Sequence, residues 1–211
     1  PSFISKNNIT TIFVNKLLIV KPGTRFKNVT SITGKVKCIG NMDNLFKDSI
    51  CPNPIKGDYR IGDWDFSEVT SVNFMFDNSR FNQNLFSKTT NGKVVCWDTS
   101  KVISSRFMFN NSDYNKPLLV DDVIWDFSSN EDISYMFNES KYNHPLVSGS
   151  VKWNTSKVQY ANYMFNESLY NHPLVVEEGC WDMSNVYYIW GIFTNSKYNH
   201  PLIVEVDNGV V

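Results

Sequence analysis

One motif recurs through most of the chain, and this repetition constrains the fold more than any other feature. Its anchor is Trp-Asp-x-Ser, with Asn in place of Asp in one copy. Twelve residues after each Trp stands a Phe, and five residues later stands an aromatic residue followed by Asn. A unit of this length cannot bury its own apolar face, so neighbouring copies must share one interior. The five anchors are Trp64, Trp97, Trp125, Trp153 and Trp181.

The variation in unit length indicates where insertions are tolerated. The intervals between successive Trp residues are 33, 28, 28 and 28, and all of the variation falls between the Leu that ends the motif and the next Trp. We therefore expect this segment to be a surface loop. In the 33-residue unit the extra residues lie within Phe86–Val95, where Asn91-Gly92 predicts a turn.

Both ends of the chain depart from the repeat. Gly34 stands where a sixth, worn unit should carry its Trp, and terminal repeats are often atypical because they cap the array. Residues 10–15 and 16–21 are predicted strands that cover the first unit. The predicted division is an N-terminal cap, residues 1–33, and one continuous six-coil array, residues 34–211. A seventh Trp would fall where Gly209 stands, so we expect either a continuing repeat or an exposed β edge that recruits a partner.

The predicted fold is a repeat solenoid of LRR-like coils, each of about 28 residues, with short parallel β-strands and short helical turns. Segments such as residues 173–176 suit strands that stack on the next coil about 4.8 Å away, and residues 160–165 suit one or two helical turns. A recurrent Asn is predicted to form an inward ladder that bonds to loop backbone groups. The ladder residues are Asn82, Asn115, Asn143, Asn171 and Asn199.

The combination of Trp-Asp-x-Ser, Met-Phe and Tyr-Asn-x-Pro-Leu resembles the bacterial surface-protein repeat of Mycoplasma and Listeria lipoproteins, a family similar to the BspA-like leucine-rich repeats. The resemblance covers residues 41–204. It implies an LRR-like solenoid, usually surface-exposed, that serves adhesion or protein binding and has no known catalysis. This chain differs in its longer units, its cysteines and its lack of a lipobox. Related repeats occur in large DNA viruses and protists, so the implied location is a cell or virion surface.

Charge and motif content argue against several function classes. The chain has 20 basic and 21 acidic residues, a balance that gives no long-range attraction to nucleic acid or anionic membranes. No apolar run is long enough for a membrane span. We find no nucleophile elbow, P-loop, dinucleotide fingerprint or HExxH, and the recurrent Asp of the anchor is typical of a turn or cap acceptor. We therefore expect no enzymatic activity, no catalytic residue and no cofactor.

Four residues at one repeat position are the candidate ligand contacts: His144, His172, His200 and Lys116. Successive units should place them in a row on the surface. A row of imidazoles could share a transition metal or sense pH. However, Gln83 holds the same position in another unit, and no carboxylate or Cys stands at a fixed offset. We therefore expect no metal here.

The four cysteines follow the repeat only in part. Cys96 and Cys180 each precede a Trp, three units apart, which is too far for a disulfide. Cys38 and Cys51 could pair within the cap, or could be small buried thiols. Free thiols fit a reduced intracellular compartment at least as well as an oxidising one. Four of six Asn-x-Ser/Thr sequons lie inside repeat motifs, where a structural role explains them, so glycosylation is a weak inference.

Three functional hypotheses follow. The first is a non-enzymatic surface or scaffold protein that binds an unidentified protein partner through its ladder rows and variable loops. The second is a structural component of a surface layer or virion, forming a homo-oligomer through the C-terminal edge of the array. The third is a carbohydrate-binding module that uses exposed aromatic residues such as Tyr160, Tyr187 and Tyr188.

Overall fold

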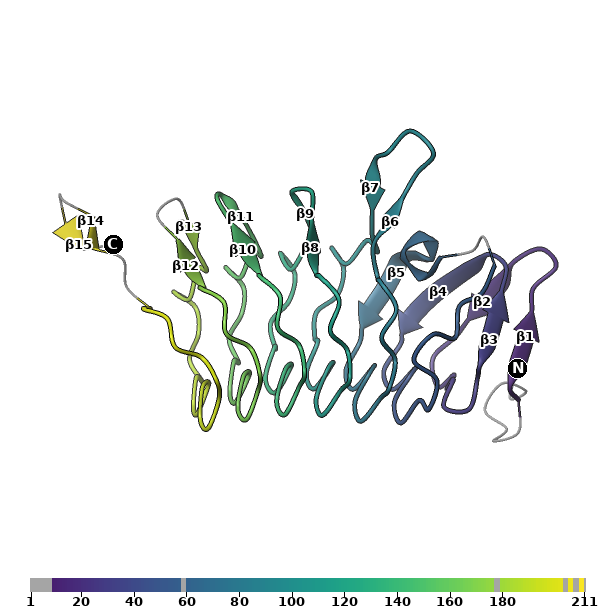
Figure 1. Ribbon diagram of the computed structural model, residues 1–211, viewed down its shortest axis with the longest axis horizontal. Helices are drawn as coiled ribbons and strands as arrows, with labels where there is room; N and C mark the ends of the chain where they lie inside the picture. The colour runs from purple at the N-terminus through teal and green to yellow at the C-terminus, as the bar shows by residue number, and fades with distance from the viewer. Residues whose placement is uncertain (1–8, 58–59, 177–178, 203–204, 207–208, 211) are drawn as a thin grey trace.

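The computed structural model describes residues 9–57, 60–176, 179–202, 205–206 and 209–210 (Figure 1). Within these residues the strands form seven small sheets, and the only helix is the 3-10 turn η1, Ile61–Asp63. None of the described residues forms a helix long and apolar enough to cross a bilayer. Parallel pairing occurs near the N-terminus, in the pair β1-β3 and in the sheet β2-β4-β5. These strands are β1 Thr11–Phe13, β2 Leu18–Val20, β3 Ser31–Thr33, β4 Val36–Asn41 and β5 Asp65–Ser71.

The segments between Leu and Trp are short antiparallel hairpins, which lie along one side of the row of units (Figure 1). The turn predicted at Asn91-Gly92 is confirmed, since Gly92 has φ +82 and its N–H group donates to the Thr89 carbonyl at 2.9 Å. The hairpins pair β6 Ser87–Lys88 with β7 Val94–Val95, β8 Leu119–Val120 with β9 Val123–Ile124, β10 Val147–Ser148 with β11 Val151–Lys152, β12 Val175–Val176 with β13 Gly179–Cys180, and β14 Glu205–Val206 with β15 Gly209–Val210.

The predicted LRR-like solenoid of parallel strands and helical turns is wrong. The segment expected to be helical, residues 160–165, is a turn in which Tyr163 has a left-handed φ of 53°. The N–H groups of Tyr163 and Phe165 donate to carbonyls of the following unit, at 2.7 and 2.8 Å. A helix needs those groups for its own carbonyls four residues back. Between these later units parallel pairing survives only as single-residue bridges, as at Tyr160 and Tyr188, while the strands lie in small separate sheets.

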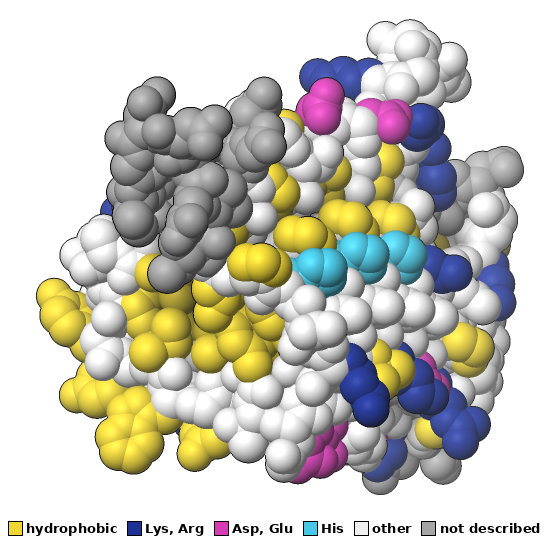
Figure 2. Space-filling model, turned by 60° about the vertical axis from the view of Figure 1, so that its left-hand side comes forward, with side chains coloured by type: hydrophobic (Ala, Val, Ile, Leu, Met, Phe, Trp, Pro, Cys, Tyr) yellow, Lys and Arg dark blue, Asp and Glu magenta, His cyan; other side chains and the backbone are white. Residues whose placement is uncertain are grey.

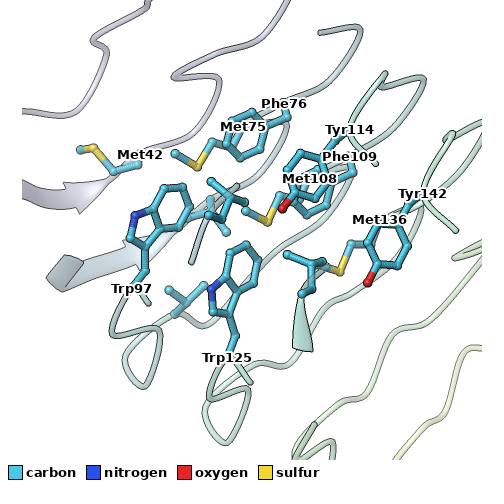
Figure 3. Packing of buried hydrophobic residues seen from close by; sticks show 14 of the residues in the cluster. Met42, Met75, Phe76, Trp97, Met108, Phe109, Tyr114, Trp125, Met136 and Tyr142 are labelled. Carbon is cyan, nitrogen blue, oxygen red and sulfur yellow. The ribbon is translucent and has the colours of Figure 1, made fainter. Parts of the chain in front are cut away.

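One continuous hydrophobic core runs through the units, as predicted from the shared aromatic positions. The indole rings of Trp97 and Trp125 stack at 5.5 Å and those of Trp153 and Trp181 at 5.4 Å. The motif Phe rings stack in a second column, with centroids 5.2 to 5.6 Å apart. Figure 3 shows the Met side chains of successive units lying in line beside these rings. The column consists of Phe46, Phe76, Phe109, Phe137, Phe165 and Phe193.

The N-terminal segment packs against the first unit. Strands β1 and β2 lie within the two segments that the sequence predicted as strands. Phe26 is fully buried, 5.3 Å from Phe46. A Cβ atom on Gly34 would lie 2.4 Å from the Cβ of Val14, so no side chain fits there. In β4 and β5, Lys37 pairs with Asp65, so the buried Val36 lies beside Trp64. The division into a cap and an array at residue 34 stays a prediction.

Candidate binding surfaces

The three histidines form a row of half-buried side chains (Figure 2). The Nε2 atom of each lies 3.1 to 3.2 Å from the backbone oxygen of the Asn one unit earlier. A carbonyl only accepts hydrogen bonds, so Nε2 is the donor in each of these contacts. In the described part of the chain, no group of three or more His, Cys, Asp and Glu residues could hold a metal ion. A ligand-binding role for His144, His172, His200 and Lys116 stays a prediction.

The Asn ladder is present but lies on the surface, so the prediction that it points inward is wrong. The Oδ1 atom of Asn82 accepts the backbone N–H of Asn115 at 2.9 Å, and this contact repeats through Asn143, Asn171 and Asn199 at 2.9 to 3.0 Å. Each amide oxygen therefore satisfies a backbone N–H group of the next unit. The ladder fixes the spacing of the neighbouring His row.

A second amide ladder was missed. Asn110 donates from Nδ2 to Asp77, Asn138 donates to Asn110, and Asn166 donates to Asn138, each at 2.6 Å. Asn138 is only 7% exposed. The sequence signal was the Asn that directly follows the motif Phe in three units. Because these amide nitrogens are already bonded and the residues are sequons, the ladder opposes glycosylation there.

The recurrent Asp is a turn acceptor, as predicted. Asp65 accepts the backbone N–H and the hydroxyl of Ser67 at 3.0 and 2.6 Å, and Asp182 accepts the N–H of Ser184 at 2.9 Å. The hydroxyl and N–H groups of these serines lower the pKa of Asp65 and of Asp182, because both bonds favour the charged carboxylate. These carboxylates hold local turns.

The last two units expose a cluster that we name the C-terminal face: Tyr160 from the unit of Trp153, and Tyr187, Tyr188, Ile189 and Trp190 from the unit of Trp181. Tyr187 and Trp190 are 73% and 72% exposed, and Figure 2 shows hydrophobic side chains gathered at this end. No earlier unit carries an aromatic residue at the positions of Tyr187 and Trp190, so the repeat itself does not require aromatic residues there, whereas Ile189 holds a position that is apolar in other units, as in Val72, Ile133 and Ala161. Ser71, Ser104 and Asp132 stand where Tyr160 and Tyr188 do, and Arg106, Ser134 and Asn162 stand where Trp190 does.

The backbone beside this face has unpaired donors. In the preceding unit, the N–H group of Ala161 donates to the carbonyl of Tyr188 at 2.8 Å, and the N–H of Tyr163 follows the same pattern. The equivalent N–H groups of Ile189 and Gly191 have no acceptor among the residues that the structure describes. The C-terminal face therefore combines exposed aromatic rings with open hydrogen-bond donors.

The cysteines do not form the disulfide considered for the cap. Cys38 and Cys51 are both free, with Cys38 fully buried in β4 and the thiol of Cys51 directed at the Thr30 carbonyl. Cys96 is also free, and the side chain of Cys180 lies outside the described residues. Burial raises the pKa of the Cys96 thiol to about 11, with Asp98 adding to the shift, and burial raises that of Cys38 further.

Alkylation of Cys96 by iodoacetamide is expected to be slow at pH 8. Only the thiolate reacts, and with a pKa of about 11 roughly one thiol in a thousand is ionised at that pH. The rate should rise about tenfold per pH unit between pH 7 and 9.5. Peptide mass spectrometry after timed quenching measures it, with urea-unfolded protein as the control. A rate that levels off near pH 8.5 would contradict the raised pKa.

Comparison with known proteins gives one family. The model described as "Mycoplasma protein of unknown function, DUF285" matches residues 24–147 and residues 83–205. The two matches together span most of the repeat units. No curated protein and no solved structure matches the chain.

Proposed function

The chain belongs to the DUF285 family, whose function is unknown, and we propose that it is a non-enzymatic protein that binds another protein through its C-terminal face. The observation that carries this proposal is the exposure of Tyr187 and Trp190, at 73% and 72%. Apolar patches of this kind mark interaction sites on folded proteins. Adhesion at a cell or virion surface is the setting that the repeat resemblance implies.

The residue types support a protein interface. Trp and Tyr supply most of the affinity where they become buried between partners, because each removes a large apolar area from water with little loss of side-chain freedom. Tyr160 and Tyr188 are stacked at 5.1 Å with nearly parallel rings, which stiffens this part of the face before any partner arrives. A pre-organised surface loses less entropy on binding.

The open donors beside the face favour a protein partner as well. The N–H groups of Ile189 and Gly191 can bond to the carbonyl groups of an extended segment, as in β-strand addition to an exposed edge. A saccharide would rest on free ring faces, and Tyr160 and Tyr188 turn one face toward each other, so only Tyr187 and Trp190 remain for it. Carbohydrate binding is the weaker alternative.

Self-association through the C-terminal edge is the second candidate, favoured by the same exposed residues. One observation weighs against it. At the other end of the array, the carbonyl of Leu45 already accepts the N–H of Phe26, so one of the acceptors that a head-to-tail contact would use is occupied. Protein binding to a different chain is therefore the preferred proposal.

The proposal is tested by capturing partners from host-cell extract on the immobilised protein, followed by mass spectrometry. The double variant Tyr187→Ala, Trp190→Ala should retain at least tenfold less of any saturably bound partner, because loss of two interface aromatic residues typically weakens binding by about 2 kcal/mol or more. Both side chains are exposed, so the variant should keep the wild-type melting temperature.

The matched control is the triple variant His144→Ala, His172→Ala, His200→Ala. Retention of the partner by this variant, with loss in the aromatic variant, supports the C-terminal face. The reverse pattern would assign binding to the His row. Recovery of the protein alone, with a concentration-dependent mass in light scattering, would replace the proposal with self-assembly.

A further inference from the structure

The one lengthened unit builds a groove that the repeat pattern does not contain. The hairpin β6-β7, the turn η1 and residues 52–57 surround a volume of about 710 Å³. In Figure 1 this hairpin extends farther from the row of units than the others. Ile55, Phe86 and Val94 supply apolar walls. A volume of this size accommodates several residues of a bound chain and greatly exceeds a single ion.

The charged residues that the structure describes in the groove are basic. Arg60, Lys88 and Lys116 line it, and none of the described lining residues is Asp or Glu. Asp63 and Asp121 pair with Arg60 and Lys88 at 2.9 and 2.6 Å without lining the groove. Lys116 takes part in no ion pair within the described ranges. Its ammonium group is therefore the charged donor of the groove that a ligand can bind without displacing a carboxylate of the protein.

The amide side chains of the groove also present donors. The Oδ1 atom of Asn82 accepts the N–H of Asn115 at 2.9 Å, and that of Asn84 accepts the N–H of Phe86 at 3.0 Å. Their Nδ2 groups have no acceptor among the described residues. The Gln83 amide is bonded at both ends, since its oxygen accepts the N–H of Ile55 and its nitrogen donates to the carbonyl of Ile55. The protein's own backbone thus occupies the amide oxygens of Asn82 and Asn84 and leaves their amide nitrogens as donors among the groove residues.

From these contacts we propose that the groove binds an acidic peptide segment of a partner protein. Carboxylates would accept bonds from Lys116, Arg60 and the amides, and an apolar side chain next to them would pack on the half-buried Val120. An acidic saccharide fits less well, because Phe86, the aromatic residue among the described lining residues, is 5% exposed and offers no ring face for a sugar to stack on. This site is separate from the C-terminal face and goes beyond it.

Binding is measured by fluorescence polarisation of a labelled decapeptide of glutamate and leucine on the full chain in 50 mM salt. The matched probe has glutamine in place of glutamate. The variant Lys116→Gln should bind the acidic peptide about tenfold more weakly, as expected for loss of one charge-assisted hydrogen bond. Lys116→Arg should restore most of the affinity. The control Lys157→Gln removes the same charge from an exposed residue outside the groove.

Selective loss in Lys116→Gln, with no binding of the glutamine probe, supports the proposal. Equal losses in Lys116→Gln and Lys157→Gln would reduce the effect to non-specific charge attraction and overturn it. Absence of saturable binding up to 1 mM peptide, or stronger binding of polygalacturonate than of peptide, would also overturn it. Circular dichroism of each variant checks that the hairpin and core are intact. The C-terminal face is unchanged in all of these variants, so this result is independent of the partner-capture experiment.

Discussion

Replacing Trp153 by Ala is expected to lower the free energy of unfolding by about 3 to 5 kcal/mol. The side chain is fully buried and lies between Phe127, at 4.3 Å, Phe137, at 6.2 Å, and Trp181, at 5.4 Å. Together with Trp153 these rings belong to three successive units, so the cavity left by the substitution cannot close without shifting the stack. Urea unfolding followed by far-ultraviolet circular dichroism measures the change.

The control is Trp190→Ala, which removes the same atoms from a side chain that is 72% exposed. It should change the free energy of unfolding by no more than about 0.5 kcal/mol.

A pair of milder substitutions, Trp to Phe, separates the effect of packing from the effect of hydrogen bonding. Trp97→Phe loses the Nε1–H bond to the Ile61 carbonyl at 2.7 Å, whereas the indole N–H of Trp153 has no partner in the described residues. Trp97→Phe should therefore lower the free energy of unfolding by about 1 kcal/mol more than Trp153→Phe does. A loss below about 1 kcal/mol for Trp153→Ala would contradict the shared core.

Replacing Asn138 by Ala is expected to lower the free energy of unfolding by about 2 to 3 kcal/mol. Its Nδ2 group donates to Asn110 and its Oδ1 atom accepts from Asn166, each at 2.6 Å. Because Asn138 is 7% exposed, water cannot easily replace the lost partners, and two neighbouring amides are left incompletely bonded. Thermal and urea unfolding of the variant give the change.

The matched control for this ladder is Asn154→Ala. Asn154 is exposed and accepts hydrogen bonds only from Ser156 in its own turn, at 3.2 and 2.7 Å. Its replacement should lower the free energy of unfolding by less than about 1 kcal/mol. Equal losses in the two variants would mean that the bonds between units add nothing beyond a local turn.

The two binding surfaces place different demands on a partner. The C-terminal face offers aromatic rings and open N–H groups, so it favours an apolar, carbonyl-presenting segment. The groove at the long hairpin offers ammonium, guanidinium and amide donors, so it favours carboxylates. Lys116 lines this groove and holds the same repeat position as the His residues, so a chain bound in the groove could continue along the His row.

The sequence by itself determined the repeat, the buried positions and the alignment of equivalent residues. A 28-residue spacing of Trp and Phe repeats one environment in every unit, so the core aromatic residues and the His row could be placed without coordinates. The N-terminal strands and the turn at Gly92 were also predictable, because local chemistry decides both.

Only the tertiary structure decided how the backbone is bonded. The residues around Tyr163 could satisfy their N–H groups within a helix or with the next unit, and sequence pattern alone does not distinguish these. The structure adopts the second arrangement, with left-handed residues between the bonds, which excludes the helical turns and the LRR-like solenoid. The sequence could not predict the exposure of Trp190 or the groove beside the long hairpin. Both depend on which parts of neighbouring units cover a residue, and the residue type does not reveal this.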